Sequence, residues 1–231
     1  MATTTSCWLL VFVWAVWWLP LMLAWAEERQ QGEGCSAKRC GNLRISDPFW
    51  LADKEAGGSC GSFDFVVGCR EDNIPVLRSS VHFGFDIKDI LYEQRTLCVV
   101  DVHKEKDLNV SDGCHVPGWN TSSKLAPPFK VHPSNLNLIF YNCTAARRGM
   151  ALAEMRCLNA TNAFVRAGVP SDVTGTYAAY ALDGCDATVV PVMGSSSGSA
   201  NTSNYEQLIK DGFLLTWDPP PLGKSTHQMT F

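Results

Sequence analysis

Cysteine is the residue that most constrains how this chain can fold. The sequence holds 10 cysteines among 231 residues, and only Cys7 lies in the uncharged N-terminal segment. Cysteines at this density downstream of such a segment are typical of a disulfide framework, which forms and persists in oxidising compartments. We therefore expect disulfides to be drawn from the remaining cysteines, which are Cys35, Cys40, Cys60, Cys69, Cys98, Cys114, Cys143, Cys157 and Cys185.

An odd number of cysteines leaves one thiol without a partner in the chain, or paired between molecules. The connectivity stays open, and Cys40–Cys60 is the one bridge that we predict. Structural zinc sites need close Cys or His spacings that recur, and none recurs here. We therefore expect neither a metal site nor a cofactor.

Residues 1–26 are typical of a signal peptide. No charged side chain occurs from Cys7 to Ala26, Pro20 interrupts the run, and Ala24-Trp25-Ala26 has the small-x-small pattern of a signal-peptidase site. We expect cleavage after Ala26, with an uncleaved anchor as the alternative. No later run of apolar residues is long enough to cross a bilayer, so we expect no membrane span after cleavage.

Glycosylation sequons agree with this route. Asn-x-Ser/Thr triplets are more frequent than the composition predicts, and an acceptor sequon is typical of a surface position in a secreted protein. We expect a secreted, extracellular glycoprotein with N-glycans at Asn109, Asn120, Asn142, Asn159 and Asn201.

Composition and motifs exclude several function classes. A net charge of −4 and a hydrophobic fraction of 46% argue against a nucleic-acid binder and a disordered tail. The histidines are scattered, and no nucleophile elbow, glycine-rich nucleotide loop or kinase catalytic motif occurs. We therefore expect that this chain is not an enzyme.

Short alternating runs predict a mainly β fold made of two small disulfide-stapled extracellular modules in tandem. The expected division is a Cys-rich domain over 27–103, a linker or loop over 104–133, a second domain over 134–217 and a tail over 218–231. Strands are expected at 63–67, 81–87, 97–102, 136–143, 176–182, 188–192 and 213–217. A short helix is expected at 204–212, where a capping residue precedes it and Gly212 ends it.

The cysteine spacing resembles a known family. The galacturonan-binding extracellular domain of plant wall-associated receptor kinases is similar to the pattern Cys35-x4-Cys40-Gly41-Asn42-Leu43-x-Ile45-x2-Pro48-Phe49-x10-Cys60-Gly61-x-Phe63-x5-Cys69, followed by Ile87-x2-Ile90-x-Tyr92. The C-terminal region of the same kinases resembles the later stretch with Leu138-x-Phe140-Tyr141-Asn142-Cys143, Cys185, Val190-Pro191-Val192 and Leu208-x3-Gly212-Phe213-x-Leu215-x-Trp217. Family members usually continue into a membrane helix and a kinase and are anchored in the plasma membrane. The resemblance thus implies a receptor-kinase ectodomain truncated before both, either by splicing or because the gene model is incomplete.

The resemblance implies a pectic ligand, and a uronate carboxylate is best bound by arginine or lysine, with aromatic rings for the sugar faces. Candidate ligand-binding residues near the pattern are Lys38, Arg39, Arg44, Arg70 and Trp50. Other aromatic candidates are Tyr92, Trp119, Tyr141 and Trp217. Acids outnumber bases between residues 27 and 100, so a polyanion needs a local basic cluster or bridging Ca²⁺.

The sequence thus predicts a non-catalytic module that binds cell-wall galacturonan, with receptor-kinase relatives as further partners. The first alternative is a soluble decoy or co-receptor in cell-wall or defence signalling, in which the spare thiol links two chains. A secreted hydrolase, or an inhibitor of cell-wall enzymes, is the second.

Overall fold

The structure is a computed structural model of the chain, and it describes residues 36–52, 61–78, 84–109, 113–146, 152–155, 157–172, 175–194 and 204–220. The predicted signal peptide, Cys35, Cys60, Asn201 and the tail beyond residue 220 lie outside the described residues. Within the described residues, no helix is long and apolar enough to cross a membrane.

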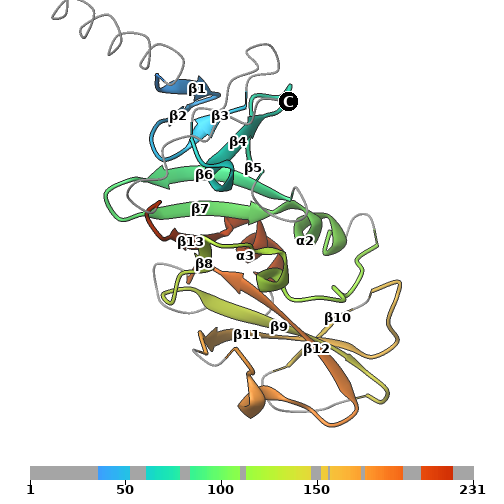
Figure 1. Cartoon of the computed structure of the whole chain (residues 1–231). Coiled ribbons are helices and arrows are strands. Elements are labelled where there is room, and N and C mark those ends of the chain that lie inside the picture. The colour runs from blue at the N-terminus through green and yellow to red at the C-terminus, as the bar shows by residue number, and fades with distance from the viewer. Residues whose placement is uncertain are drawn as a thin grey trace, which may run out of the picture.

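Two β-sheets and a hairpin form the mainly β fold that the sequence predicts (Figure 1). The hairpin pairs β1 (Lys38–Cys40) with β2 (Leu43–Ile45). A seven-stranded sheet has the order β3-β4-β5-β6-β7-β13-β8, with the bounds Trp50–Leu51, Val66–Cys69, Pro75–Leu77, Phe85–Leu91, Thr96–Asp101, Phe213–Trp217 and Phe129–Val131. A four-stranded sheet has the order β10-β11-β9-β12, with the bounds Ala153–Met155, Ala163–Pro170, Leu136–Cys143 and Cys185–Val192.

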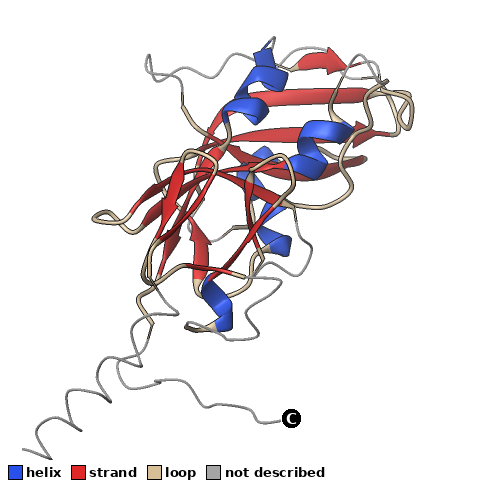
Figure 2. Cartoon of the chain, turned by 90° about the horizontal axis from the view of Figure 1, so that it is seen from above, coloured by secondary structure: helices blue, strands red, loops and turns tan. Residues whose placement is uncertain are grey.

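The seven-stranded sheet curls around an aromatic core. Phe49 precedes edge strand β3 and Phe129 begins the opposite edge strand β8, yet their rings stack with centroids 6.2 Å apart. Phe49 also meets Trp217 edge to face at 4.9 Å, and all three side chains are buried. Because the two edges meet through these rings, the inner face is a closed core and the outer face is left for other contacts. Figure 2 shows this curvature from above.

Two short helices lie between the sheets. Helix α3 (Tyr205–Asp211) contacts both β7 and β12, and it also packs against α2 (Val102–Asp107). Leu208 and Ile209 of α3 join the apolar cluster on one face of the four-stranded sheet. Gly212 ends α3 at φ 88°, as the sequence predicts, and β13 follows directly.

The segment predicted as a linker over 104–133 carries short regular elements between stretches without helix or strand. It contains most of α2, the 3₁₀-helix η3 (Thr121–Lys124) and β8. The buried carboxylate of Asp101 organises this segment, because it accepts the backbone N–H groups that begin α2 and bonds Lys124 Nζ at 2.7 Å. Lys104 is fully buried beside it, and burial lowers the pKa of that lysine to about 8.

Two predicted strands are wrong in part or in full. Residues Phe63–Phe65 form the 3₁₀-helix η1, because the Ser62 side chain caps the backbone N–H of Asp64, and only then does β4 begin. The strand expected at 176–182 is the 3₁₀-helix η4 (Ala178–Tyr180), which Tyr177 begins at a left-handed φ of 48°. The strands expected at 136–143 and 213–217 are confirmed as β9 and β13.

Three disulfides join the described cysteines, as Cys40–Cys69, Cys114–Cys157 and Cys143–Cys185. The predicted Cys40–Cys60 bridge is therefore wrong, because Cys69 at the end of β4 reaches Cys40 at the end of β1. The expectation that Cys98 belongs to the disulfide framework is also wrong, since this residue carries a free, half-buried thiol on β7 between β6 and β13. Among the described residues it is the unpaired thiol that the odd count predicts.

Candidate functional site

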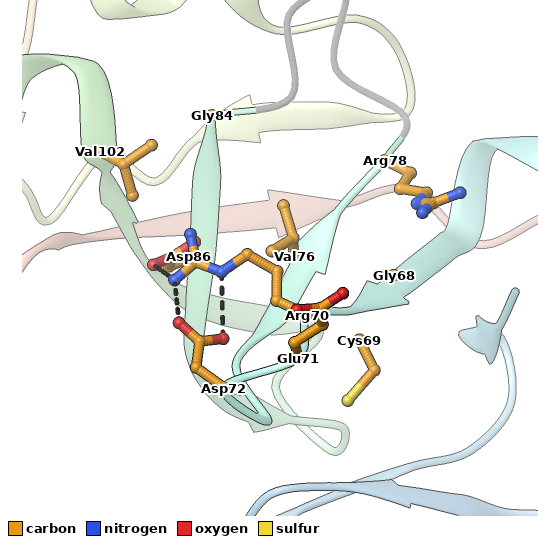
Figure 3. A pocket seen from close by; sticks show the side chains of 10 residues that line it. All are labelled: Gly68, Cys69, Arg70, Glu71, Asp72, Val76, Arg78, Gly84, Asp86 and Val102. Atoms are coloured by element: carbon orange, nitrogen blue, oxygen red, sulfur yellow. Dashed lines mark hydrogen bonds and ion pairs between the residues drawn. The ribbon is translucent and has the colours of Figure 1, made fainter.

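A cavity of about 740 Å³ opens on the outer face of the seven-stranded sheet (Figure 3). Its floor is a cross-strand row in which Gly68 of β4 pairs with Val76 of β5, and Val76 pairs with Asp86 of β6. Neighbouring positions Val67, Leu77 and Phe85 point into the aromatic core instead. Strand alternation thus separates the core residues from the residues that line the cavity.

Arg70 is the cation at the centre of this cavity. Its Nη2 donates to Asp86 Oδ2 at 2.9 Å, and its Nε donates to Asp72 Oδ1 at 3.3 Å. The Arg70 side chain is 43% exposed and that of Asp72 is 54% exposed, whereas Asp86 is only 17% exposed. The Asp86 contact therefore anchors the guanidinium from below, and Asp72 holds it from the solvent side.

Asp86 uses only one of its two carboxylate oxygens. Oδ2 accepts from Arg70, but Oδ1 is buried and has no hydrogen-bond partner among the described residues. Burial raises the pKa of Asp86, and the Arg70 charge offsets only part of that effect. A buried acceptor without a donor is costly, so Asp86 Oδ1 is an unused acceptor of a residue that lines the cavity.

Gly68 leaves room for a second guanidinium. A Cβ atom at this position would lie 2.5 Å from Arg78 Nε, so a larger residue would displace the Arg78 side chain from its place across β4. Arg78 follows β5 and also lines the cavity. Two arginines therefore border the same cavity (Figure 3).

The β1–β2 hairpin brings more positive charge to this flank. The Cys40–Cys69 disulfide places Arg39 next to one bonded cysteine and Arg70 next to the other, with the two cysteine Cα atoms 5.8 Å apart. Arg39 pairs with Arg44 across the hairpin, and both are exposed. Among the described residues neither arginine has an ion-pair partner.

Lys38 is separated from that arginine pair by strand alternation. It pairs with the buried Ile45, so it belongs to the hairpin face opposite Arg39 and Arg44. The structure thus places Arg39 and Arg44 on one face of the hairpin and Arg70 in the cavity, with the Cys40–Cys69 disulfide joining the two segments.

Trp50 lies on the same outer face of the sheet, because β3 runs beside β4 with Trp50 opposite Val66. Its Nε1 donates to the Ser62 carbonyl at 3.0 Å, and its ring meets Phe63 at 6.2 Å. Phe63 is 74% exposed, so this pair is an aromatic surface open to solvent.

Other aromatic candidates are placed differently. Trp217 and Tyr141 are buried in the two cores, which excludes them from a surface site. Tyr92 holds the hairpin, since its hydroxyl donates to the Arg44 carbonyl and accepts from Ser46 N, both at 2.9 Å. The exposed Trp119 has Lys104 Nζ 5.1 Å from its ring centroid.

Sequence reasoning missed Asp86, Asp72 and Arg78. The sequence does indicate that Asp86 points away from the core. It is the polar residue between Phe85 and Ile87 in an alternating run. Its contact with Arg70 depends on how β4, β5 and β6 pair, which no local pattern indicates.

The described residues contain no group of three or more His, Cys, Asp or Glu side chains that could hold a metal ion. Glu71, Asp72 and Asp86 are the carboxylates that line the cavity, and Arg70 bridges two of them, Asp72 and Asp86. The cavity is thus arranged around a guanidinium, which suits an anionic ligand.

Known proteins are similar to this chain in two respects. Residues 35–101 match the family described as wall-associated receptor kinase galacturonan-binding, and these residues contain every cavity residue discussed above. A leaf rust 10 disease-resistance locus receptor-like protein kinase-like 1.2 of Arabidopsis thaliana is 30% identical over 191 residues, which cover 80% of this chain and 28% of that protein. The chain therefore spans less than a third of that relative's length. No solved structure matches this chain.

Proposed function

We propose that this chain, in which residues 35–101 match the wall-associated receptor kinase galacturonan-binding family, binds pectin-type galacturonan outside the cell without acting on it as an enzyme. The observation that carries the proposal is the Arg70–Asp86 pair, which borders an open cavity with one buried carboxylate oxygen left unused.

Galacturonan fits the chemistry of this pair. Each sugar unit of the polymer offers a carboxylate and hydroxyl groups. The Arg70 guanidinium can bind a carboxylate through two parallel N–H groups once the exposed Asp72 gives way. A sugar hydroxyl can then donate to Asp86 Oδ1, which has no donor of its own among the described residues. The proposed site therefore binds a carboxylate and a hydroxyl group of the same polymer. A neutral glucan has no carboxylate and cannot make the first contact.

A polymer can engage more than one basic position. Arg39 and Arg44 lie on the hairpin that Cys40–Cys69 joins to the cavity strand. A chain of several uronates that leaves the cavity on this side would meet two further guanidinium groups. Contacts made by one polymer at two places raise the overall affinity beyond that of either place alone.

Trp50 and Phe63 supply the apolar part of the proposed site. Sugar rings have an apolar face, and an aromatic side chain can pack against it while hydroxyl groups reach toward polar partners. Both rings are on the side of β4 that carries the cavity. The proposed ligand-binding residues are therefore Arg39, Arg44, Trp50, Phe63, Arg70, Arg78 and Asp86.

We place this role in an extracellular glycoprotein. Three disulfides among the described residues agree with an oxidising compartment. The matched relative is named a receptor-like protein kinase, and this chain corresponds to 28% of it. We propose that receptor-kinase relatives are the signalling partners and that the cell wall is the location.

Retention on immobilised polygalacturonate tests the proposal. The secreted full chain is compared with the double variant Arg70→Gln/Asp86→Asn, in which neither charge is left without its partner. Charge-assisted hydrogen bonds contribute about 1.5–3 kcal/mol. The double variant should therefore bind polygalacturonate with an affinity lower by a factor of about 10 or more. Added salt should also weaken the wild type.

Lys130→Ala is the matched control, because Lys130 is an exposed cation on β8 that is paired with Asp218 and does not line the cavity. It should bind as the wild type does. Equal retention of the double variant, or equal retention of the wild type on a neutral glucan, would refute the assignment. Retention that requires Ca²⁺ would shift the site to carboxylate groups.

A further inference from the structure

Three of the predicted glycosylation sequons lie wholly in the described residues, and their asparagines differ in what the side-chain amide does. These sequons are Asn120-Thr121-Ser122, Asn142-Cys143-Thr144 and Asn159-Ala160-Thr161. Asn109 is described, but the rest of its sequon is not. The amide matters because glycosylation changes its hydrogen-bonding capacity.

Asn159 uses both ends of its amide on one backbone residue. Val116 N donates to Asn159 Oδ1 at 2.8 Å, and Asn159 Nδ2 donates to Val116 O at 3.1 Å. Since both partners belong to Val116, the Asn159 amide must turn one edge toward that residue. This edge carries the amide oxygen and the N–H that lies cis to the oxygen. The side chain thus imitates a β-bridge to a buried residue.

This contact continues a short ladder beside a disulfide. Cys114 is bonded to Cys157, and Leu158 N donates to Cys114 O at 2.8 Å. Val116 and Asn159 each follow the bonded cysteines by two positions. The amide therefore extends the junction between segment 113–117 and the turn before β11.

N-glycosylation would remove the hydrogen that this junction needs. In that step the Nδ2 atom bonds to the anomeric carbon of an oligosaccharyl diphosphate donor, the diphosphate leaves and one amide proton is released. The product is a secondary amide, which strongly prefers the trans arrangement, with the sugar carbon beside the oxygen. That is the position of the N–H that donates to Val116 O.

Asn120 and Asn142 have no such conflict. Asn120 only accepts, from Val189 N at 2.7 Å, and a secondary amide keeps this acceptor. It also borders a hollow of about 320 Å³. Asn142 is exposed on β9, borders a hollow of about 420 Å³, and its amide makes no hydrogen bond within the described part of the chain.

We infer that the folded chain carries N-glycans at Asn120 and Asn142 and none at Asn159, because a glycan there would remove the N–H that clamps Val116. The inference rests on the proposed extracellular location, which supplies the glycosylation machinery. It does not depend on the proposed ligand, so a failure to bind galacturonan leaves it standing.

Site occupancy in the full chain secreted from plant cells tests the inference. Enzymatic deglycosylation in heavy-oxygen water marks each asparagine that carried a glycan, and peptide mass spectrometry reads the marks. We expect marks at Asn120 and Asn142 and none at Asn159. A mark at Asn159 in the folded protein, or unmarked Asn120 or Asn142, would overturn the inference.

Two alanine variants separate the clamp from the sequon. Thr161→Ala destroys the Asn159 sequon at an exposed position and should leave the glycan mass and the Tm unchanged. Asn159→Ala destroys the same sequon and the clamp, and should lower the Tm by about 4–8 °C, also without change in glycan mass. A loss of glycan mass in both variants, or equal Tm values, would contradict the assignment.

Discussion

Arg70 and Asp86 show how one ion pair can hold a site together and still leave capacity for a ligand. Arg70 was identifiable from the sequence because it follows Cys69 directly, in a region where a cation suits a uronate. Asp86 was not identified, because its importance comes from burial and from an oxygen without a donor among the described residues. Residue type is visible in a sequence, whereas burial at the end of a three-strand row depends on the fold.

A pH dependence of stability follows from the burial of Asp86. Its pKa in the fold is raised above the ordinary value of 3.8, so between these two values the folded chain keeps a proton that the unfolded chain has released. The free energy of unfolding contributed by this group is therefore largest below 3.8 and falls as the pH rises through the raised pKa. Asp86→Asn should abolish this fall.

Urea midpoints at a series of pH values, from below 3.8 to neutrality, measure the effect. Asp72→Asn is the matched control, since it removes the exposed carboxylate that bonds the same arginine, and it should keep the fall. An unchanged pH profile in Asp86→Asn would show that burial of this carboxylate has no energetic consequence.

At the scale of elements, strands with strong local patterns were predictable. The apolar runs that became β9 and β13 contain little that opposes a strand, and the helix before Gly212 has a clear end signal. The segments around the 3₁₀-helices η1 and η4 were mistaken for strands because both contain aromatic residues, which are frequent in strands. What distinguishes these helices from strands is a side-chain cap at Ser62 and a left-handed backbone at Tyr177, which are local features that an apolar pattern does not indicate.

The turn from α3 into β13 depends on glycine at position 212. Its φ of 88° disfavours any side chain, and a Cβ there would collide with the Val99 carbonyl on β7. Gly212→Ala should therefore destabilise the fold by about 2–4 kcal/mol, measured by urea unfolding.

Gly175→Ala is the control for backbone strain alone. Gly175 also has a positive φ, of 66°, but nothing in the described structure lies within 4 Å of a Cβ built there. We expect a loss of about 1 kcal/mol for this variant. Equal losses at the two glycines would contradict the proposed collision at Val99.

On the scale of the whole molecule, the two sheets do not follow the order of the chain. Strand β8 comes from the segment predicted as a linker, and β13 comes from the C-terminal segment, yet both lie in the seven-stranded sheet with β3 to β7. Sequence patterns predicted that β13 exists. They did not predict that it pairs with β7 at Val99 and with β8 at Val131, which are far away in sequence. Long-range pairing of this kind has no local signature.

The Cys40–Cys69 bridge is the long-range link that matters most for the proposed site. Replacing both cysteines by alanine removes a cross-link over a sequence separation of 29 residues, which should cost about 3 kcal/mol of stability. It should also weaken galacturonate retention, because the hairpin that carries Arg39 and Arg44 is no longer joined to the segment that carries Arg70. Matched removal of Cys143 and Cys185, in the other sheet, should lower stability with unchanged retention. The reverse pattern would place the ligand on the four-stranded sheet.

The central claim is that galacturonan binds at the outer face of β4, β5 and β6. Hydrogen–deuterium exchange of the secreted chain, with and without an oligogalacturonate, tests it most directly. We predict slower exchange over 68–78 and 84–88 and in the hairpin at 38–45, with β9, β11 and β12 unchanged. Protection confined to those three strands, or absent from 68–78 at a saturating ligand concentration, would contradict the account.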